Sequence, residues 1–279
     1  MRLSAITDEI SQDLRHALSV MAEYDIREAE LRNVYGKYIV EADEELLEKI
    51  EKDLKDAGMT ICCLDTPFYK CDLDDADTTA TGPTHGARDR GREEQLHLLN
   101  RSIDLARRLG TSYIRIFSFW KRGPLTMEIE ERIADALMTP ARIAERAGVT
   151  LVLENEHACY LGTGAETARV IEKVGSSALK MVWDPGNAFM AGEQPFPSGY
   201  QAAAPHIGHV HVKDAHADES GKLSFTVIGG GEIDYVGQFA ALKESGYTGA
   251  ISLETHYKGP NGDIESASRE CLAALRKLI

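Results

Sequence analysis

Short apolar runs alternate with longer amphipathic stretches along the whole chain of 279 residues. A short apolar run predicts a buried strand, and apolar positions three and four residues apart predict a helix that packs one face. The clearest helix is expected over 43–57, where leucine and isoleucine form one apolar stripe among charged residues. Eight strands are predicted, at Leu3–Ile6, Arg27–Leu31, Met59–Leu64, Ser112–Phe117, Thr150–Glu154, Leu179–Trp183, Ile207–Val212 and Ala250–Leu253.

Glycines mark the ends of several predicted helices, directly before the next strand. A helix C-terminus often needs a positive φ, which glycine adopts without strain. These glycines are Gly58, Gly110, Gly148 and Gly246. The alternation continues without a Pro/Gly/Ser-rich linker, so we predict one α/β domain over 1–279, a (β/α)₈ TIM barrel with outer helices. A doubly wound sheet is disfavoured because Thr7-Asp8-Glu9, rather than a glycine-rich turn, follows the first strand.

A polar insertion at 70–92 interrupts the alternation after the third predicted strand. It is rich in Asp, Thr and Gly. A loop of this length inside a compact domain is usually either a lid over a functional site or a disordered segment. The composition of the insertion fits both interpretations.

The charge balance is acidic, with 31 Lys+Arg against 45 Asp+Glu and a net charge of -14. This disfavours nucleic acid as a partner, because binding a phosphate backbone requires a basic surface. No apolar window approaches the roughly 20 residues that a membrane helix needs, and we see no secretory signal. The 5 cysteines form no CxxC motif, which is typical of reduced thiols in a cytoplasmic protein.

Four successive predicted strands carry metal-ligand side chains at their C-terminal ends, which is where a (β/α)₈ barrel forms its active site. The residues are Glu154, Asp184, His211 and Glu254. Apolar residues at the alternating positions are expected to pack outward against the helices. Buried carboxylates are costly unless they are compensated. Three carboxylates and one imidazole suit one divalent metal, Mn²⁺ most of all, with Mg²⁺, Co²⁺ or Zn²⁺ as alternatives.

Further candidate substrate contacts lie beside these strand ends. They are Glu156, His157, Asn187, Lys213 and His256. Side chains two positions apart share a face of a strand, so several of these should point the same way as the expected metal ligands. Arg32 and Lys121 follow other strands and could hold a substrate carboxylate or phosphate. The alternative for the basic residues is internal pairing, for example between Glu30 and Arg115.

The strand ends also carry a family resemblance. They read LVLENEH, MVWDPGNAF, IGHVHVKD and ISLETHY, and earlier segments read AITDEI, EAELRNVYG and LDTPFYK. Together they resemble the xylose isomerase-like TIM-barrel superfamily of sugar (phosphate) isomerases and epimerases, over essentially the whole chain. The resemblance implies that Glu154, Asp184, His211 and Glu254 are metal ligands. It also implies that Glu154 and Glu254 form the acid/base pair, and that the chain could assemble as a homodimer or homotetramer.

The function expected from this resemblance is a metal-dependent isomerase or epimerase of a sugar, keto-sugar or related polyol. It would act by proton transfer through a metal-stabilised enediolate. The alternative is a metal-dependent dehydratase of the inosose or 3-dehydroshikimate type, which uses the same first step. A third possibility is a barrel that binds its ligand without catalysis.

Two departures from the family pattern narrow these expectations. Endonuclease IV members carry additional histidine ligands from the early strands, whereas the third and fourth strands here end in Thr66-Pro67 and Ser118-Phe119. This makes DNA repair improbable. Lys213-Asp214 replaces a Gly-Glu run of the ketose 3-epimerases, so Lys213 is expected to be a substrate anchor, a general acid or a partner of Asp214.

Overall fold

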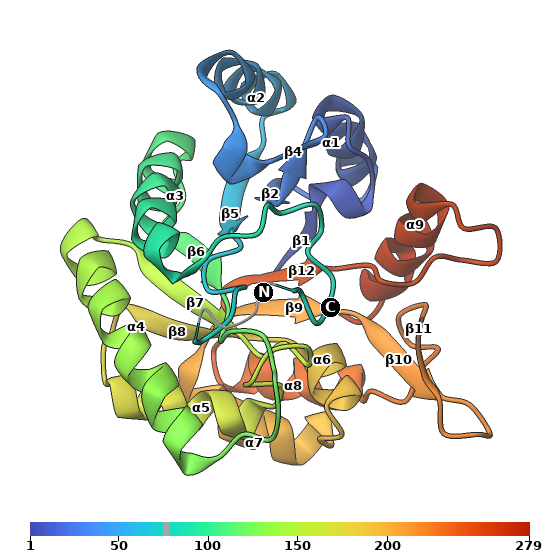
Figure 1. The fold of residues 1–279 in the computed structure, drawn as a ribbon. Helices are drawn as coiled ribbons and strands as arrows, with labels where there is room; N and C mark the ends of the chain where they lie inside the picture. The colour runs from blue at the N-terminus through green and yellow to red at the C-terminus, as the bar shows by residue number, and fades with distance from the viewer. Residues whose placement is uncertain (75–78) are drawn as a thin grey trace.

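The computed structural model describes residues 1–74 and 79–279. Within these residues, eight parallel strands close into a barrel that helices surround (Figure 1), which confirms the predicted (β/α)₈ fold. The strands are β1 (Arg2–Ile6), β2 (Glu28–Leu31), β5 (Thr60–Asp65), β6 (Tyr113–Ile116), β7 (Thr150–Glu154), β8 (Leu179–Trp183), β9 (Ile207–Val212) and β12 (Ala250–Leu253). They follow one another around the barrel in chain order, and β1 pairs with β12 to close it.

Helices pack around this barrel. They are α1 (Leu14–Glu23), α2 (Glu44–Ala57), α3 (Gln95–Leu109), α4 (Met127–Ala147), α5 (Gly164–Val174), α6 (Pro185–Met190), α7 (Tyr200–Ala203), α8 (Tyr235–Glu244) and α9 (Ile264–Leu275). In α2 the Asp43 side chain caps the start by accepting a hydrogen bond from the Leu46 N–H at 3.0 Å. Gly58 ends it with φ at 62°. None of the helices in the described residues is long and apolar enough to cross a bilayer.

Two small hairpins and several short helical turns complete the fold. The hairpins are β3 (Asn33–Val34) with β4 (Lys37–Tyr38), and β10 (Asp214–Ala217) with β11 (Leu223–Thr226). The turns are η1 (Thr7–Glu9), η2 (Ile39–Glu41), η3 (Arg92–Glu94), η4 (Pro195–Gly199) and η5 (Ala204–His206). Both hairpins were missed by the apolar-run pattern, because strands of two to four residues carry too little periodicity.

Side chains alternate along each strand between two buried regions, the core between the strands and the helices and the inside of the barrel. Leu153, Val210, Val212 and Leu253 face outward, as predicted, and belong to the large apolar core that includes the helices. Inside the barrel, a small cluster formed by Cys63, Val152 and Val182 fills the space between the strands. Buried polar residues occupy the inward positions nearer the C-terminal ends of the strands. The inside of the barrel is therefore packed with apolar side chains below and lined with polar side chains at the C-terminal ends of the strands, which form its mouth.

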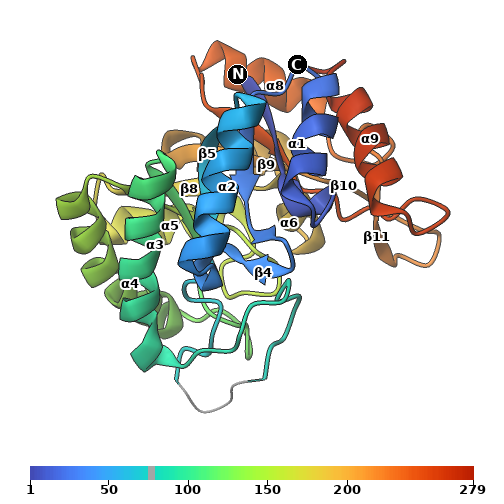
Figure 2. The ribbon, with the colours of Figure 1, turned by 90° about the horizontal axis from the view of Figure 1, so that it is seen from above.

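The described part of the insertion, residues 70–74 and 79–92, runs across the C-terminal face of the barrel (Figure 1). Figure 2 shows it at the end of the molecule opposite to the two termini. The Thr81 hydroxyl donates to the Ala158 carbonyl at 3.2 Å, and the Asn33 amide donates to the His85 carbonyl at 2.7 Å. Residues 75–78 of the insertion lie outside the described residues.

Candidate active site

The structure brings Glu154, Asp184, His211 and Glu254 together at the mouth of the barrel. One ligand atom from each lies within 4.8 Å of the others, and no side chain of the four is more than 3% exposed. They come from β7, β8, β9 and β12, which are neighbours in the barrel, so parallel pairing alone carries the four strand ends to one place. The sequence predicted these residues as one set.

His211 fits a metal ligand in a way that the sequence did not reveal. Its Nδ1 is buried without a hydrogen-bond partner and lies 3.8 Å from Glu154 Oε1 and 3.6 Å from Glu254 Oε2. Its Nε2 lies 2.9 Å from Glu30 Oε1. Histidines that bind a metal through one nitrogen usually donate from the other to a carboxylate, a backbone carbonyl or a water. An unpartnered buried nitrogen facing two carboxylates is therefore what a divalent cation requires at this position.

The Asp-Pro-Gly-Asn segment after β8 explains how Asp184 is placed. Asp184 Oδ1 accepts from the Asn187 N–H at 2.9 Å and caps α6, and Pro185 occupies the first helical turn. The other oxygen, Asp184 Oδ2, faces the site and lies 2.8 Å from Lys213 Nζ. Gly186 provides room for Lys213, because a Cβ there would lie 2.4 Å from Lys213 Cγ. The segment therefore positions one carboxylate and one cation at once.

Buried cations compensate the carboxylates of the site. Arg115 Nη1 donates to Glu154 Oε2 at 3.2 Å, and Arg32 Nη1 donates to Glu254 Oε1 at 3.0 Å. Lys213 also donates to Glu254. Arg32 and Arg115 are thus paired internally, which was the alternative to substrate binding. The specific pair expected, Glu30 with Arg115, is wrong, since Arg115 contacts Glu154 and Asp65 while Glu30 accepts from two histidines.

Lys213 does not pair with its neighbour Asp214, which corrects one of the three expectations for this lysine. Asp214 instead accepts hydrogen bonds from the N–H groups of Ala215, Gly229 and Gly231. A Cβ at Gly231 would lie 2.2 Å from Asp214 Oδ1, so the glycine run closes tightly on this carboxylate. Substrate anchor and general acid stay as the two predictions for Lys213.

The surrounding charges shift the pKa of the central carboxyls. Burial raises the pKa of Glu254, but Lys213, His256 and His211 lower it well below its usual value. Burial and Glu254 raise the pKa of Glu154, but Arg115 and His211 lower it overall. Both side chains are therefore carboxylates at neutral pH, able to accept a proton or a cation.

The expected substrate contacts Glu156, His157 and Asn187 lie together beside Glu154. The Asn187 amide donates to Glu154 Oε1 at 2.9 Å, and its Oδ1 lies 3.0 Å from His157 Nδ1. His157 Nδ1 also lies 3.0 Å from Glu156 Oε1. Lys70 Nζ lies 3.6 Å from Glu156 Oε2 and 4.2 Å from the centre of the Phe117 ring.

His256 and Lys121 have different surroundings. His256 Nε2 lies 3.5 Å from Glu254 Oε1, and its ring packs edge-on against Phe225 at 4.8 Å between centroids. Lys121 is exposed beyond β6, and no hydrogen bond or ion pair joins its side chain to the site among the described residues. The structure therefore brings the expected contacts together with the exception of Lys121.

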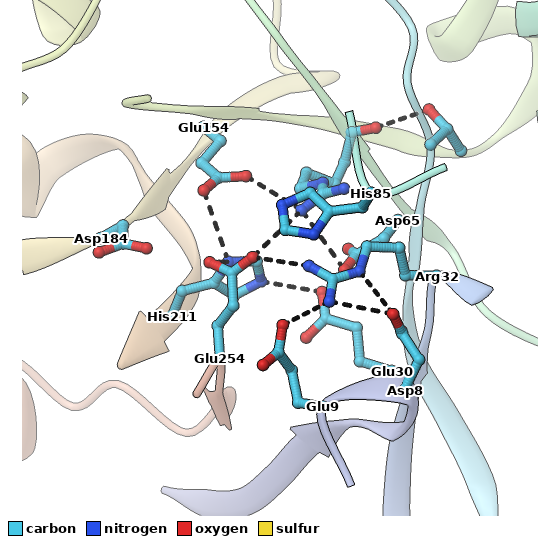
Figure 3. A network of polar contacts seen from close by, with 12 residues as sticks. Asp8, Glu9, Glu30, Arg32, Asp65, His85, Glu154, Asp184, His211 and Glu254 are labelled. Carbon is cyan, nitrogen blue, oxygen red and sulfur yellow. Dashed lines mark hydrogen bonds and ion pairs between the residues drawn. The ribbon is translucent and has the colours of Figure 1, made fainter. Parts of the chain in front are cut away.

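Three further residues line the site without having been singled out from the sequence. Asp8 and Glu9 bind Arg32, and a ring nitrogen of His85 lies within 4.8 Å of the Glu254 carboxylate (Figure 3). Burial, Arg32 and Lys70 lower the pKa of His85. Asp8 and Glu9 lie in η1, the turn that follows β1, so the strand-end rule could have identified them. His85 lies in the polar insertion and offered no periodic signal.

The sequence of this chain is similar to those of several curated proteins. An inosose dehydratase of Clostridium beijerinckii is 33% identical over 140 residues, which are 44% of this chain and 45% of that protein. This chain spans about half the length of the curated relatives that it matches.

Solved structures match over nearly the whole chain. An L-ribulose 3-epimerase superposes with a TM-score of 0.74 at 21% identity, covering 99% of this chain and 94% of that one. The IOLI protein with a bound zinc atom superposes with a TM-score of 0.78 at 19% identity, covering 100% and 98%. At these identities the likeness shows the fold. The model of the xylose isomerase-like TIM barrel family matches residues 19–278, and the chain belongs to this family.

Proposed function

We propose that this chain is a metal-dependent isomerase or epimerase of a sugar, a keto-sugar or a related polyol. The observation that carries the proposal is the pair of buried carboxylates Glu154 and Glu254, which both face the unpartnered His211 Nδ1. They reach this space from β7 and β12, with β8 and β9 between them. Carboxylates that approach from separate strands can remove a proton from one side of a substrate carbon and return one from another side.

Glu154, Asp184, His211 and Glu254 would hold one divalent ion, for which we propose Mn²⁺. Three carboxylates and one imidazole form a donor set suited to manganese or magnesium. When bound, such an ion polarises the carbonyl and hydroxyl oxygens of the substrate and acidifies the adjacent carbon-bound proton. The zinc bound by the similar IOLI protein supports a divalent ion in this fold.

The other residues of the site would bind and orient the substrate and its bases. Arg115 and Asn187 fix the Glu154 carboxylate, and Arg32 fixes Glu254. Lys213 lies next to Asp184 and Glu254, where its ammonium can hold a substrate oxygen. The near-complete burial of these groups excludes bulk water and strengthens each of these interactions.

A dehydratase of the inosose type is the second candidate, and the named relative in Clostridium beijerinckii favours it. In that reaction a carboxylate removes the proton next to the carbonyl, and the hydroxyl one carbon further leaves as water after gaining a proton. Lys213 or the Glu156–His157 pair could supply this proton, because Lys213 contacts Glu254 and Asn187 joins His157 to Glu154.

Incubation in heavy water with a panel of ketohexoses and a 2-keto-inositol tests the proposal. We expect deuterium to enter at the carbon next to the carbonyl and an epimer or isomer to form. Glu154→Gln and Glu254→Gln should each lower kcat by about 10² to 10⁴-fold, whereas the exposed Glu219→Gln should not. Water loss without an epimer would establish the dehydratase instead. Absence of deuterium exchange with every ketone would contradict both candidates.

Metal content gives an independent test. Elemental analysis of protein purified without chelator should find one divalent ion per chain, and chelation should lower the Tm because the buried carboxylates lose their partner. Return of Mn²⁺ should restore the Tm. A chain that retains no ion, and whose Tm does not respond to Mn²⁺, would overturn the assignment of the four ligands.

A further inference from the structure

Residues 79–91 cross the C-terminal face of the barrel (Figure 1), and His85 of this segment lies beside Glu254 of the candidate active site (Figure 3). The segment is tied to the barrel rim at separate points. Gly82 packs so closely on the rim that a Cβ there would lie 2.4 Å from Ala158 Cβ and 3.5 Å from the Trp120 ring. A few residues further on, the Asn33 amide holds the His85 carbonyl. A substrate bound at the mouth would therefore touch this segment as well as the strand ends.

His85 is the residue of this segment that reaches the central carboxylates. A ring nitrogen of His85, the Glu254 carboxylate and a ring nitrogen of His256 lie within 4.8 Å of one another. The His85 and His256 ring centroids are 5.7 Å apart. Figure 3 shows the His85 ring beside Glu254 and Arg32.

The backbone of His85 adopts a conformation that needs support. Its φ is 53°, in the left-handed region that residues other than glycine seldom occupy. The support comes from Asn33, whose amide donates to the His85 carbonyl at 2.7 Å and also to Asp8 Oδ2 at 3.2 Å. Asp8 in turn accepts from Arg32, which holds Glu254. A strained conformation fixed by the network that orients a proposed base indicates a functional role.

His85, His256 and Phe225 form one wall of rings over the site. They come from the insertion, the loop after β12 and strand β11, so three separate segments converge here. Ring faces suit the C–H face of a sugar, and imidazole nitrogens suit its hydroxyl groups, since a neutral imidazole both donates and accepts hydrogen bonds. The polar residues Glu156, His157 and Asn187 lie instead beside Glu154.

We propose that His85 is a substrate-binding residue that hydrogen-bonds a hydroxyl of a polyhydroxy ketone on the side of the site where Glu254 acts. The inference rests on the function proposed above and extends it, because it adds a specificity-determining contact from outside the strand ends. Because His85 lies beside Glu254, the substrate hydroxyl that it binds would lie close to the reacting carbon. The configuration of the carbon that bears this hydroxyl would then decide which ketones the enzyme accepts.

The test compares His85→Ala, His85→Gln and, as a matched control, His97→Ala, an exposed histidine of α3. All variants are loaded with Mn²⁺, and their metal content and Tm are measured. Kinetics use the ketone that the wild type converts best, and calorimetry measures the binding of myo-inositol, which lacks the carbonyl. We expect His85→Ala to raise KM and the myo-inositol Kd by about 10-fold, with a smaller change in kcat. His85→Gln should recover part of the affinity, and His97→Ala should match the wild type.

Two results would overturn the inference. Wild-type KM and myo-inositol Kd in His85→Ala would show that the ring does not contact substrate, and loss of the bound metal in that variant would make His85 a metal ligand instead. Failure of the proposed function has a separate signature, since the wild type would then exchange no deuterium with any ketone of the panel. The myo-inositol comparison tests the role of His85 in either case.

Discussion

Glu30 shows how far the candidate site depends on a residue that would touch neither metal nor substrate. Its two oxygens lie 2.9 Å from His211 Nε2 and 2.9 Å from His209 Nε2. Burial raises the pKa of Glu30, but the two histidines lower it well below its usual value, so the side chain is a carboxylate. This carboxylate fixes the orientation of the His211 ring and directs Nδ1 to the four-residue set.

Glu30→Gln should therefore weaken metal binding by about 10 to 100-fold, although no ligand is changed. The amide has the same shape but lacks the charge, and it can accept from only one of the two histidines. Competition with a chelator of known affinity measures the effect. Glu28→Gln, on the same strand but half-buried and paired with Arg2, serves as the control and should keep the wild-type affinity. Equal affinities in both variants would exclude a role for Glu30 in holding the metal ligand.

The residues of the site differ in how far the sequence could predict them. Glu154, Asp184, His211 and Glu254 end four adjacent strands, and alternation along a strand with closure of the barrel is enough to bring them together. The partner of Arg115 was not predictable, because several buried carboxylates compete for it and the choice depends on rotamers at the ångström scale.

At the level of elements, the strands were predictable and the connections were not. The last four predicted strands match the observed bounds residue for residue, and the first four differ by one residue at one or both ends. Buried parallel strands read as apolar runs with clear limits. The β3–β4 hairpin and the path of 79–92 carry no such pattern, and both are fixed by single side chains such as Asn33.

The same hairpin illustrates how one buried carboxylate joins several elements. Asp53 lies in α2, and its side chain is 1% exposed. It accepts from the hydroxyl of Tyr35 at 2.6 Å in the β3–β4 turn, and from Arg15 of α1 at 2.7 Å. Burial raises the pKa of Asp53, but Tyr35, Arg15 and Lys49 lower it overall.

Asp53→Asn should lower the free energy of unfolding at pH 7 by about 2 kcal/mol, because hydrogen bonds to a charged acceptor are lost. The folded-state pKa lies below the unfolded value, so this stabilisation is complete above the unfolded pKa of about 4 and disappears as the pH falls through the folded pKa. Urea unfolding at pH 7 and pH 3 should show a smaller difference at pH 3. Asp56→Asn, exposed on the same helix, should have little effect at either pH. A difference that does not change with pH would contradict the ionic explanation.

On the scale of the whole molecule, the net charge of -14 and the pairing of the buried cations at the mouth of the barrel both favour an uncharged substrate over a phosphorylated one. In the described part of the chain, each buried cation at the mouth lies within 3.6 Å of a carboxylate oxygen. These cations are Arg32, Lys70, Arg115 and Lys213. A phosphate group would have to displace one of these carboxylates and approach against the negative field of the protein. An uncharged hydroxyl group neither has to displace a carboxylate nor is repelled by the negative field.

An uncharged polyhydroxy ketone should therefore be a better substrate than its phosphate ester, with kcat/KM at least about 10-fold higher at low salt. The measurement compares one ketose with its phosphate ester on the Mn²⁺-loaded enzyme, at low ionic strength and at 0.5 M salt, where the Debye length is only about 4 to 5 Å. Salt should raise kcat/KM for the ester by screening the repulsion and leave the value for the neutral ketose nearly unchanged. Lys121→Gln serves as a control. Among the expected substrate contacts, Lys121 is the one basic residue whose exposed ammonium has no ion pair within the described residues. A preference for the ester that Lys121→Gln abolishes would place a phosphate subsite at this lysine and reverse the conclusion drawn from charge pairing.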